Sequence, residues 1–356
     1  MSASPLDNPI MSGLLGDEEA SACFSVEADL VAMLDFEKAL ASAEAAENLV
    51  PAEAAEAIAA ALSPDKLDLG ALRAGAARDG VVVPELVRQL RAMVGEPFGR
   101  HVHFGATSQD VIDTSLAIRL KALLTILGRR LDSTIGKLDA LDEAQGTIET
   151  MAHTRMQAAL PVPAARKIRS WRDPLIRHRE SLAAAEAAIG VLHFGGAVGT
   201  LEKLGDKGEA VSCRMGETLG LRTVAYARHS ERDGPAFLAN WLSMVTGSLG
   251  KMGQDIALLA QSEVGEIRLA GGGGSSAMPH KVNPVGAEVL VSLARFNATL
   301  LPGMHHAMVH ENERSGAAWT LEWMLLPQMS VATAAALRNA EGLLDGLSFV
   351  ARPVAS

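Results

Sequence analysis

One apolar seam between residues 233 and 267 constrains the fold of this chain more than any other feature of the sequence. Its apolar residues recur in alternating steps of four and three, the spacing of a helix that packs lengthwise against other helices. The positions are Leu238, Leu242, Val245, Leu249, Met252, Ile256 and Leu259. A helix of about 30 residues spans roughly 45 Å. The seam therefore predicts an extended helix bundle, shared between subunits.

The rest of the chain indicates an all-α fold. Hydrophobic residues make up 48% of the 356 residues and aromatic residues only 4%, with heavy use of alanine and leucine, which favour helices. Further long helices are expected over residues 111–145, from 166 to about 189, from 284 past 296 and over 319–344. Residues 1–106 contain shorter helical patterns broken by prolines, with a brief extended piece at 81–83. We expect an N-terminal helical domain, 1–106, and a bundle domain, 107–356.

The charge and the cysteines limit the class of protein. The formal net charge of -10 argues against a nucleic-acid-binding protein, which normally has a basic face. The first 37 residues contain no lysine or arginine, so a secretory signal is not expected, and no apolar run reaches the ~18 residues of a membrane span. Cys23 and Cys213 have no metal-type spacing and are expected to be buried thiols. These features predict a soluble cytoplasmic protein.

The stretch GGGGSSAMPHKVNP, residues 271–284, interrupts two predicted helices. Its glycines permit positive φ angles and bring backbone N–H groups close to a ligand. Hydroxyls, a cation and an amide follow at Ser275, Ser276, Lys281 and Asn283. No Gly-Lys-Ser/Thr follows the glycines, so the stretch is not a Walker P-loop. It indicates an anion-binding loop, with a plain linker as the alternative.

A second polar stretch, HVHFGATSQDVIDT, covers residues 101–114. Thr107 and Asp110 have the spacing of a capping box, so one reading is simply a well-capped helix. The other reading is a carboxylate site. Thr107 and Ser108 place hydroxyls and free N–H groups at the positive end of a long helix, and His103 stands just before it.

Two further stretches give weaker signals. One is MAHTRMQAALPVP, residues 151–163. Polar residues alternate there as if on one side of an extended piece, at His153, Arg155 and Gln157. A solvated surface turn is the simpler reading. In residues 305–327, His306 and His310 have helical i, i+4 spacing. The sequence shows no obvious third metal ligand near them, so no metal site is predicted. Arg314, beside Ser315 and Gly316, is a candidate ligand-binding residue.

Together these stretches resemble the fumarase/aspartase superfamily. Its signature loop, Gly-Ser-Ser-x-Met-Pro-x-Lys-x-Asn-Pro, is complete at residues 274–284. TSQDVIDT (107–114), HFGGAVGT (193–200), RDG (232–234) and LLAQSEVGEI (258–267) follow the superfamily's order. HENERSGAAWTLEWMLLP (310–327) is most similar to the superfamily's muconate cycloisomerase branch. The resemblance covers almost the whole chain.

The resemblance implies a fold, an activity and a set of site residues. The fold is a homotetramer around a shared long-helix bundle, with active sites that combine segments of different subunits. The activity is lactonization of a tricarboxylate muconate, without a metal or organic cofactor and without a nucleic-acid or membrane partner. By motif position Ser275 is the catalytic serine. Substrate-binding residues are expected at His103, Thr107, Ser108, Arg155, Gln157, Ser276, Lys281, Asn283 and Arg314.

The sequence departs from the superfamily's pattern in two places. Arg155 stands in HTRMQ (153–157) where superfamily members often have a catalytic histidine, and we expect it to bind a carboxylate instead. The chain also stops where its relatives are expected to continue into a small C-terminal helical domain. An adenylosuccinate-type or argininosuccinate-type lyase is the nearest enzymatic alternative. An inert scaffold with the same fold is the non-enzymatic one.

Overall fold

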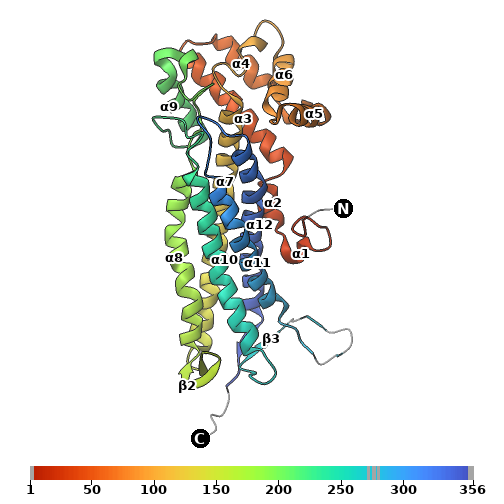
Figure 1. Cartoon of the computed structure of the whole chain (residues 1–356), viewed down its shortest axis with the longest axis vertical. Coiled ribbons are helices and arrows are strands. Elements are labelled where there is room, and N and C mark those ends of the chain that lie inside the picture. Colours follow the sequence, from red (N-terminus) through yellow and green to blue (C-terminus); the bar gives the residue numbers. More distant parts are fainter. Residues whose placement is uncertain (1–3, 271–272, 275–277, 279–280, 352–356) are drawn as a thin grey trace.

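Long helices run side by side along the length of the molecule (Figure 1). The computed structural model describes residues 4–270, 273–274, 278 and 281–351. In the described part of the chain the bundle consists of α7 (Ser108–Gln145), α8 (Ala165–Ile189), α10 (Asp233–Leu259), α11 (Val285–His306) and α12 (Ala317–Asp345). Helix α10 packs against α8, α11 and α12, and α7 packs against α8 and α12. The predicted all-α bundle is confirmed.

The apolar seam of α10 lies in the bundle core. All seven of its predicted positions are buried. However, the predicted end of this helix at residue 267 is wrong, because α10 ends at Leu259 and Ile267 begins strand β3 (Ile267–Leu269). A turn follows the helix, with Gly265 N–H donating to the Gln261 carbonyl at 2.7 Å and Gly265 at a φ of 54°. The left-handed conformation favours glycine at this point of the connection between α10 and β3.

Shorter helices form a head at one end of the bundle (Figure 1). They are α3 (Val26–Ala46), α4 (Ala52–Ala61), α5 (Leu69–Asp79), α6 (Val83–Val94) and α9 (Gly208–Leu219), with 3₁₀ turns η1 (Pro64–Lys66), η2 (Gly99–His101) and η3 (Glu202–Lys207). Helices α1 (Ser12–Leu15) and α2 (Glu18–Ala22) lie beside α12. The extended piece predicted at 81–83 is wrong. Val83 is the first residue of α6, and Pro84 suits the first helical turn.

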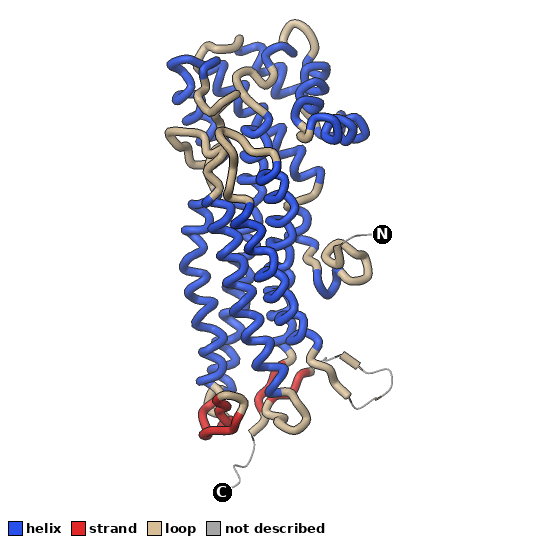
Figure 2. Tube along the Cα trace, in the orientation of Figure 1, coloured by secondary structure: helices blue, strands red, loops and turns tan. Residues whose placement is uncertain are grey.

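The strands lie at the end of the bundle away from the head (Figure 2). Strands β1 (Glu149–Thr154) and β2 (Gln157–Pro163) form an antiparallel hairpin, and β3 pairs with β4 (Leu347–Phe349). The predicted single extended piece through Arg155 is wrong. Arg155 and Met156 form the two-residue hairpin turn, at φ angles of 48° and 67°. Positive φ at both positions is typical of a type I′ turn, which agrees with the surface-turn reading.

Two expectations about single side chains are also corrected. Cys23 is only half-buried and Cys213 is exposed, so neither is a buried thiol. His306 is the last residue of α11 and His310 lies beyond it, so the two do not share a helical face. Within the described ranges, no group of histidine, cysteine and acidic side chains is arranged to hold a metal ion. None of the helices described is both long and apolar enough to cross a membrane.

Candidate functional site

The head end of the bundle holds the start of α7 in a network of hydrogen bonds. Thr107 and Asp110 form the predicted capping box, in which Thr107 N–H donates to Asp110 Oδ2 at 2.9 Å. Asp110 is fully buried and also accepts from the backbone N–H groups of Gly195 and Gly196, at 2.9 and 3.0 Å. His229 contacts the same carboxylate at 2.8 Å. The predicted anion-binding helix start is thus fixed by two distant segments, the backbone at 195–196 and His229.

His103 lies just before this helix and is held by α3. Its Nδ1 lies 2.6 Å from Oε1 of Glu37, which is almost fully buried. Burial lowers the pKa of His103, but the charge of Glu37 and the hydrogen bond to it outweigh burial and raise the pKa above its usual value. Sequence reasoning predicted His103 but missed Glu37. No local motif marks Glu37, which is 66 residues away from His103.

Arg314 is tied to α7 through Gln109. Arg314 Nε donates to Gln109 Oε1 at 3.0 Å, and Arg314 Nη2 donates to the Ala197 carbonyl at 3.2 Å. Gln109 Nε2 donates in turn to Asp113 Oδ2 at 3.0 Å. The Arg314 side chain itself is exposed. The structure therefore presents a positioned guanidinium to solvent, beside the helix start that carries Thr107 and Ser108.

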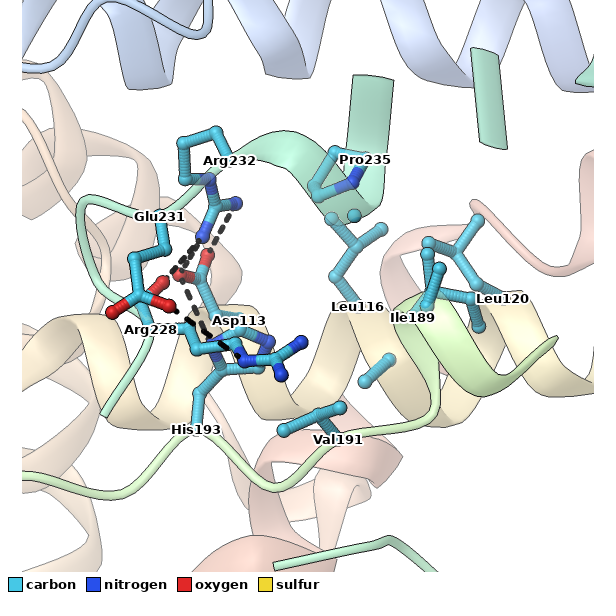
Figure 3. A pocket seen from close by; sticks show the side chains of 13 residues that line it. Asp113, Leu116, Leu120, Ile189, Val191, His193, Arg228, Glu231, Arg232 and Pro235 are labelled. Atoms are coloured by element: carbon cyan, nitrogen blue, oxygen red, sulfur yellow. Dashed lines mark hydrogen bonds and ion pairs between the residues drawn. The ribbon is translucent and has the colours of Figure 1, made fainter. Parts of the chain in front are cut away.

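A buried ion network lies beneath this surface (Figure 3). Arg232 Nη1 donates to Asp113 Oδ2 at 2.8 Å, and Arg232 Nη2 donates to Glu322 Oε1 at 2.5 Å. Asp113 also accepts from Trp319 Nε1 at 2.9 Å. Burial would raise the pKa of Asp113, but the charge of Arg232 lowers it below its usual value. His193 lies 4.0 Å from Asp113, and burial lowers its pKa to about 4, so it is neutral at pH 7.

A cavity connects Ser108 and Arg314. Its volume is about 840 Å³, and its walls come from the end of α5 with the two residues after it, the start of α7, the segment before α12 and the first turns of α12. The lining includes Ser108, Arg314, Thr320 and Trp323. Of the four predicted residues at this end, Ser108 and Arg314 line this cavity, while Thr107 and His103 precede Ser108 in the chain and are not part of the lining.

The signature loop lies at the opposite end of the bundle, after β3. Its base is closed by two backbone hydrogen bonds between Gly273 and Asn283, at 3.0 and 2.8 Å. Lys281 is exposed, and Asn283 lines a cavity of about 220 Å³ together with Arg338 and Asn339 of α12. The predicted catalytic Ser275 and its neighbour Ser276 lie outside the described residues.

The β1–β2 hairpin presents Arg155 and Gln157 at the same end, and both are exposed. A buried acid missed by sequence reasoning anchors its base. Met151 N–H donates to Glu266 Oε1 at 2.8 Å, and Lys167 Nζ donates to the Met151 carbonyl, also at 2.8 Å. Burial lowers the pKa of Lys167. Glu266 directly precedes β3, so it links the hairpin to the strand that leads into the signature loop.

The predicted site residues thus fall into two half-sites at opposite ends of one chain. The head half-site contains His103, Thr107, Ser108 and Arg314, and the loop half-site contains Arg155, Gln157, Lys281 and Asn283. Helix α7 has 38 residues and spans about 57 Å between the two ends. A ligand with three carboxylates is far shorter than this distance. A single chain therefore does not assemble all the predicted residues around one small molecule.

The comparisons with known proteins first define the class. Residues 16–296 match the family model described as "Lyase". The chain belongs to this lyase family, the fumarase/aspartase superfamily, as its signature motifs predicted.

Within that family the chain is similar to 3-carboxy-cis,cis-muconate cycloisomerase of Pseudomonas aeruginosa, with 40% identity over 92% of this chain and 72% of the relative. The crystal structure of the 3-carboxy-cis,cis-muconate lactonizing enzyme from Pseudomonas putida matches with a TM-score of 0.91 and 37% identity, over 97% of this chain and 78% of that one. Trans-aconitate decarboxylase 1 of Mycosarcoma maydis is 31% identical over 95% of this chain and 68% of the relative.

Proposed function

We propose that this protein is a cycloisomerase that converts 3-carboxy-cis,cis-muconate to 4-carboxymuconolactone, a step in the breakdown of protocatechuate. The observation that carries the proposal is the 40% identity to the Pseudomonas aeruginosa cycloisomerase over 92% of the chain. The complete signature loop at residues 274–284 supports an active enzyme over an inert scaffold. No organic cofactor or metal ion takes part in the proposed reaction.

The charges of the two half-sites suit a substrate with three carboxylates. Arg314 and His103 supply positive charge at the head half-site, and the free N–H groups at the start of α7 add the positive end of a helix dipole. Lys281 and Arg155 supply cations at the loop half-site. These local cations attract a tri-anion to a chain whose net charge is -10.

The proposed reaction needs a proton donor and stabilisation of negative charge. One carboxylate of the substrate attacks the carbon at which the ring closes and forms the C–O bond of the lactone. The π electrons of the double bond move to the adjacent carbon, whose carboxylate takes up the charge as an aci-carboxylate dianion. Lys281 and Asn283 stabilise this dianion, and Ser275 gives the carbon its proton. No group leaves, so substrate and product are isomers.

Arg155 has a binding role in this proposal. An internal carboxylate needs no proton transfer to activate a leaving group, so the histidine that is often found at this position is not required. The exposed guanidinium of Arg155, at the tip of the hairpin, contributes instead to carboxylate binding.

The separation of the half-sites supports an assembly of several chains. In a cytoplasmic homotetramer with antiparallel bundles, the head half-site of one protomer meets the loop half-site of another. A site assembled in this way contains Arg314 and Lys281 from different protomers.

The test is the ultraviolet absorbance of purified protein mixed with 3-carboxy-cis,cis-muconate, because lactonization destroys the conjugated diene. We expect rapid loss of absorbance with the parent protein and no loss with Ser275→Ala. Ser292→Ala is the matched control, because this exposed hydroxyl only donates to a carbonyl of its own helix. Persistent absorbance with the folded parent protein contradicts the proposal. Fumarate release from adenylosuccinate or argininosuccinate, or CO₂ release from trans-aconitate, then identifies the alternative.

A further inference from the structure

Two acidic side chains lie in the interior of the head, on the same helix. Glu37 and Glu44 of α3 are 1% and 0% exposed. The only hydrogen bond of the Glu37 carboxylate to a described residue joins its Oε1 to Nδ1 of His103 at 2.6 Å. Its Oε2 and both oxygens of Glu44 have no hydrogen-bond partner among the described residues. Burying carboxyl groups without partners destabilises a fold, so this arrangement needs an explanation beyond packing.

The backbone of His103 is also constrained. Its φ is 63°, in the left-handed region that residues other than glycine rarely adopt. The preceding residue, Val102, is buried, and its carbonyl accepts a hydrogen bond from Arg91 Nη2 at 3.2 Å. The segment is thus fixed from α6 while the imidazole is fixed from α3. The other nitrogen of the ring, Nε2, has no hydrogen bond to any described residue.

The charges around His103 favour its protonated form. Glu37 of α3 and Asp110 of α7 stabilise the imidazolium, while Arg91 of α6 opposes it. Glu44 adds no negative charge at neutral pH, because burial, and then the charge of Glu37, raise its pKa to about 9. Glu44 is therefore a neutral neighbour of the Glu37–His103 pair.

We propose that Glu37 is a positioning residue that orients the His103 ring and favours its imidazolium form, with Nδ1–H donated to Glu37 and Nε2–H directed to a substrate carboxylate. This inference rests on the proposed function, in which His103 belongs to the substrate-binding head half-site. This binding role differs from that of a general acid–base catalyst, because such a catalyst needs both protonation states near the working pH. In this role His103 binds a carboxylate, as Arg314 does.

The titration of His103 can be measured without substrate. Exchange of the imidazole Cε1 hydrogen for deuterium, followed over a pH series by mass spectrometry, gives the pKa of each histidine. We expect the pKa of His103 to lie above the ordinary value of 6.5 in the parent protein and to fall below it in Glu37→Gln. Glu37→Asp keeps the charge and is expected to restore most of the increase. Glu44→Gln is the matched control, because it replaces a neutral buried side chain, and the pKa of His103 is expected to stay as in the parent.

The kinetic measurement tests the consequence for binding. At pH 7.5 we expect Glu37→Gln to raise KM for 3-carboxy-cis,cis-muconate by about tenfold, the effect of one pKa unit, while kcat changes much less. Glu37→Asp is expected to give an intermediate KM, and Glu44→Gln the parent KM. The exchange rates of the other nine histidines report whether each variant keeps its fold.

Three outcomes overturn the inference. A parent His103 pKa at or below 6.5 contradicts it without any variant. An unchanged His103 pKa in folded Glu37→Gln shows that Glu37 does not hold the charge. A lowered pKa with an unchanged KM shows that the charge does not bind substrate. The exchange result stands even if the protein fails to lactonize the muconate, so failure of the proposed function is distinguishable from failure of this inference.

Discussion

Gln109 and Arg314 are joined by a hydrogen bond of 3.0 Å between Oε1 and Nε, although 205 residues separate them in the chain. The same amide donates to Asp113 Oδ2 and to the His229 carbonyl. Gln109 thus orients an exposed cation from a fully buried position. The head half-site depends on this buried amide as well as on the residues that reach the substrate.

Gln109→Leu is therefore expected to weaken substrate binding without removing a charged group. Arg314 loses one of its two hydrogen bonds and keeps the one to the Ala197 carbonyl, and KM is expected to rise several-fold while kcat changes little. The loss of the buried hydrogen bonds is expected to reduce the free energy of unfolding by about 1–3 kcal/mol. Steady-state kinetics and urea unfolding measure the two effects.

Gln89→Leu is the matched control for this substitution. Gln89 is also a buried amide, but it bonds to Asp68 and Glu85 in the head and contacts no predicted site residue. We expect a similar loss of stability with the parent KM. Equal KM values for Gln109→Leu and Gln89→Leu would show that Gln109 does not position Arg314 for binding.

Arg232→Met is expected to be strongly destabilising. The substitution leaves Asp113 and Glu322 buried without their shared cation, and breaking a buried ion pair in this way typically costs about 3–5 kcal/mol. Thermal and urea unfolding measure the change. Arg78→Met is the control, since the side chain of Arg78 is 65% exposed and pairs with its sequence neighbour Asp79. That change is expected to have little effect on stability, because exposed ion pairs contribute little, and equal effects of the two substitutions contradict the prediction.

His193 is expected to make the stability depend on pH in the acid range. Its pKa is about 4 in the folded protein, below the ordinary 6.5, so the unfolded chain binds more protons between these values. The contribution is complete above pH 6.5 and is lost as the pH falls toward 4. It amounts to about 3 kcal/mol on the scale of 1.36 kcal/mol per pKa unit.

Unfolding of the parent protein and of His193→Gln by urea, over pH 4–7.5, measures this effect. The slope of stability against pH between 4 and 6.5 is expected to be smaller in His193→Gln, because the substituted side chain does not titrate. His153→Gln makes the same change at an exposed position and controls for the substitution. Parallel curves for the parent and His193→Gln show that the buried histidine does not control acid stability.

Mixed oligomers test whether one active site combines two chains. Arg314→Ala and Lys281→Ala each remove a cation from a different half-site, and each variant alone is expected to be nearly inactive. After co-expression, roughly a quarter of the parent activity is expected, because random mixing leaves one site in four with both residues intact. The double variant Arg314→Ala/Lys281→Ala is the control, since it has no intact half-site to contribute. Activity of the mixture no higher than that of the separate variants shows that both residues act within one chain.

The long helices could be predicted from the sequence because their signal is local. The seam from Leu238 to Leu259 repeats over many turns, and every position in it is buried. The signal of α7 is also local, because a capping box marks its start. The ends of elements were harder to predict. The predicted helix extended to residue 267, yet α10 ends at Leu259 and a turn that includes Gly265 follows.

The motifs predicted which residues belong to the site, but they did not show what positions them. Glu37, Gln109 and Glu266 act through partners that are 66, 205 and 115 residues away. Such pairs leave no periodicity or spacing in one sequence, because they form only when the head, the bundle and the hairpin pack together. His310 illustrates the opposite error, since a helical spacing from His306 was present although α11 ends before it.

Helix α7 sets the distance and the angle between the two half-sites of a protomer. Its 38 residues run without a break from the capping box at Thr107 to the turn that precedes the hairpin. Inserting a single residue in its middle would lengthen it by about 1.5 Å and rotate one end against the other by roughly 100°. Both half-sites would keep their own contacts, but their relative position and direction would change. In the proposed tetramer, the length of this one helix would therefore determine whether half-sites of different protomers meet.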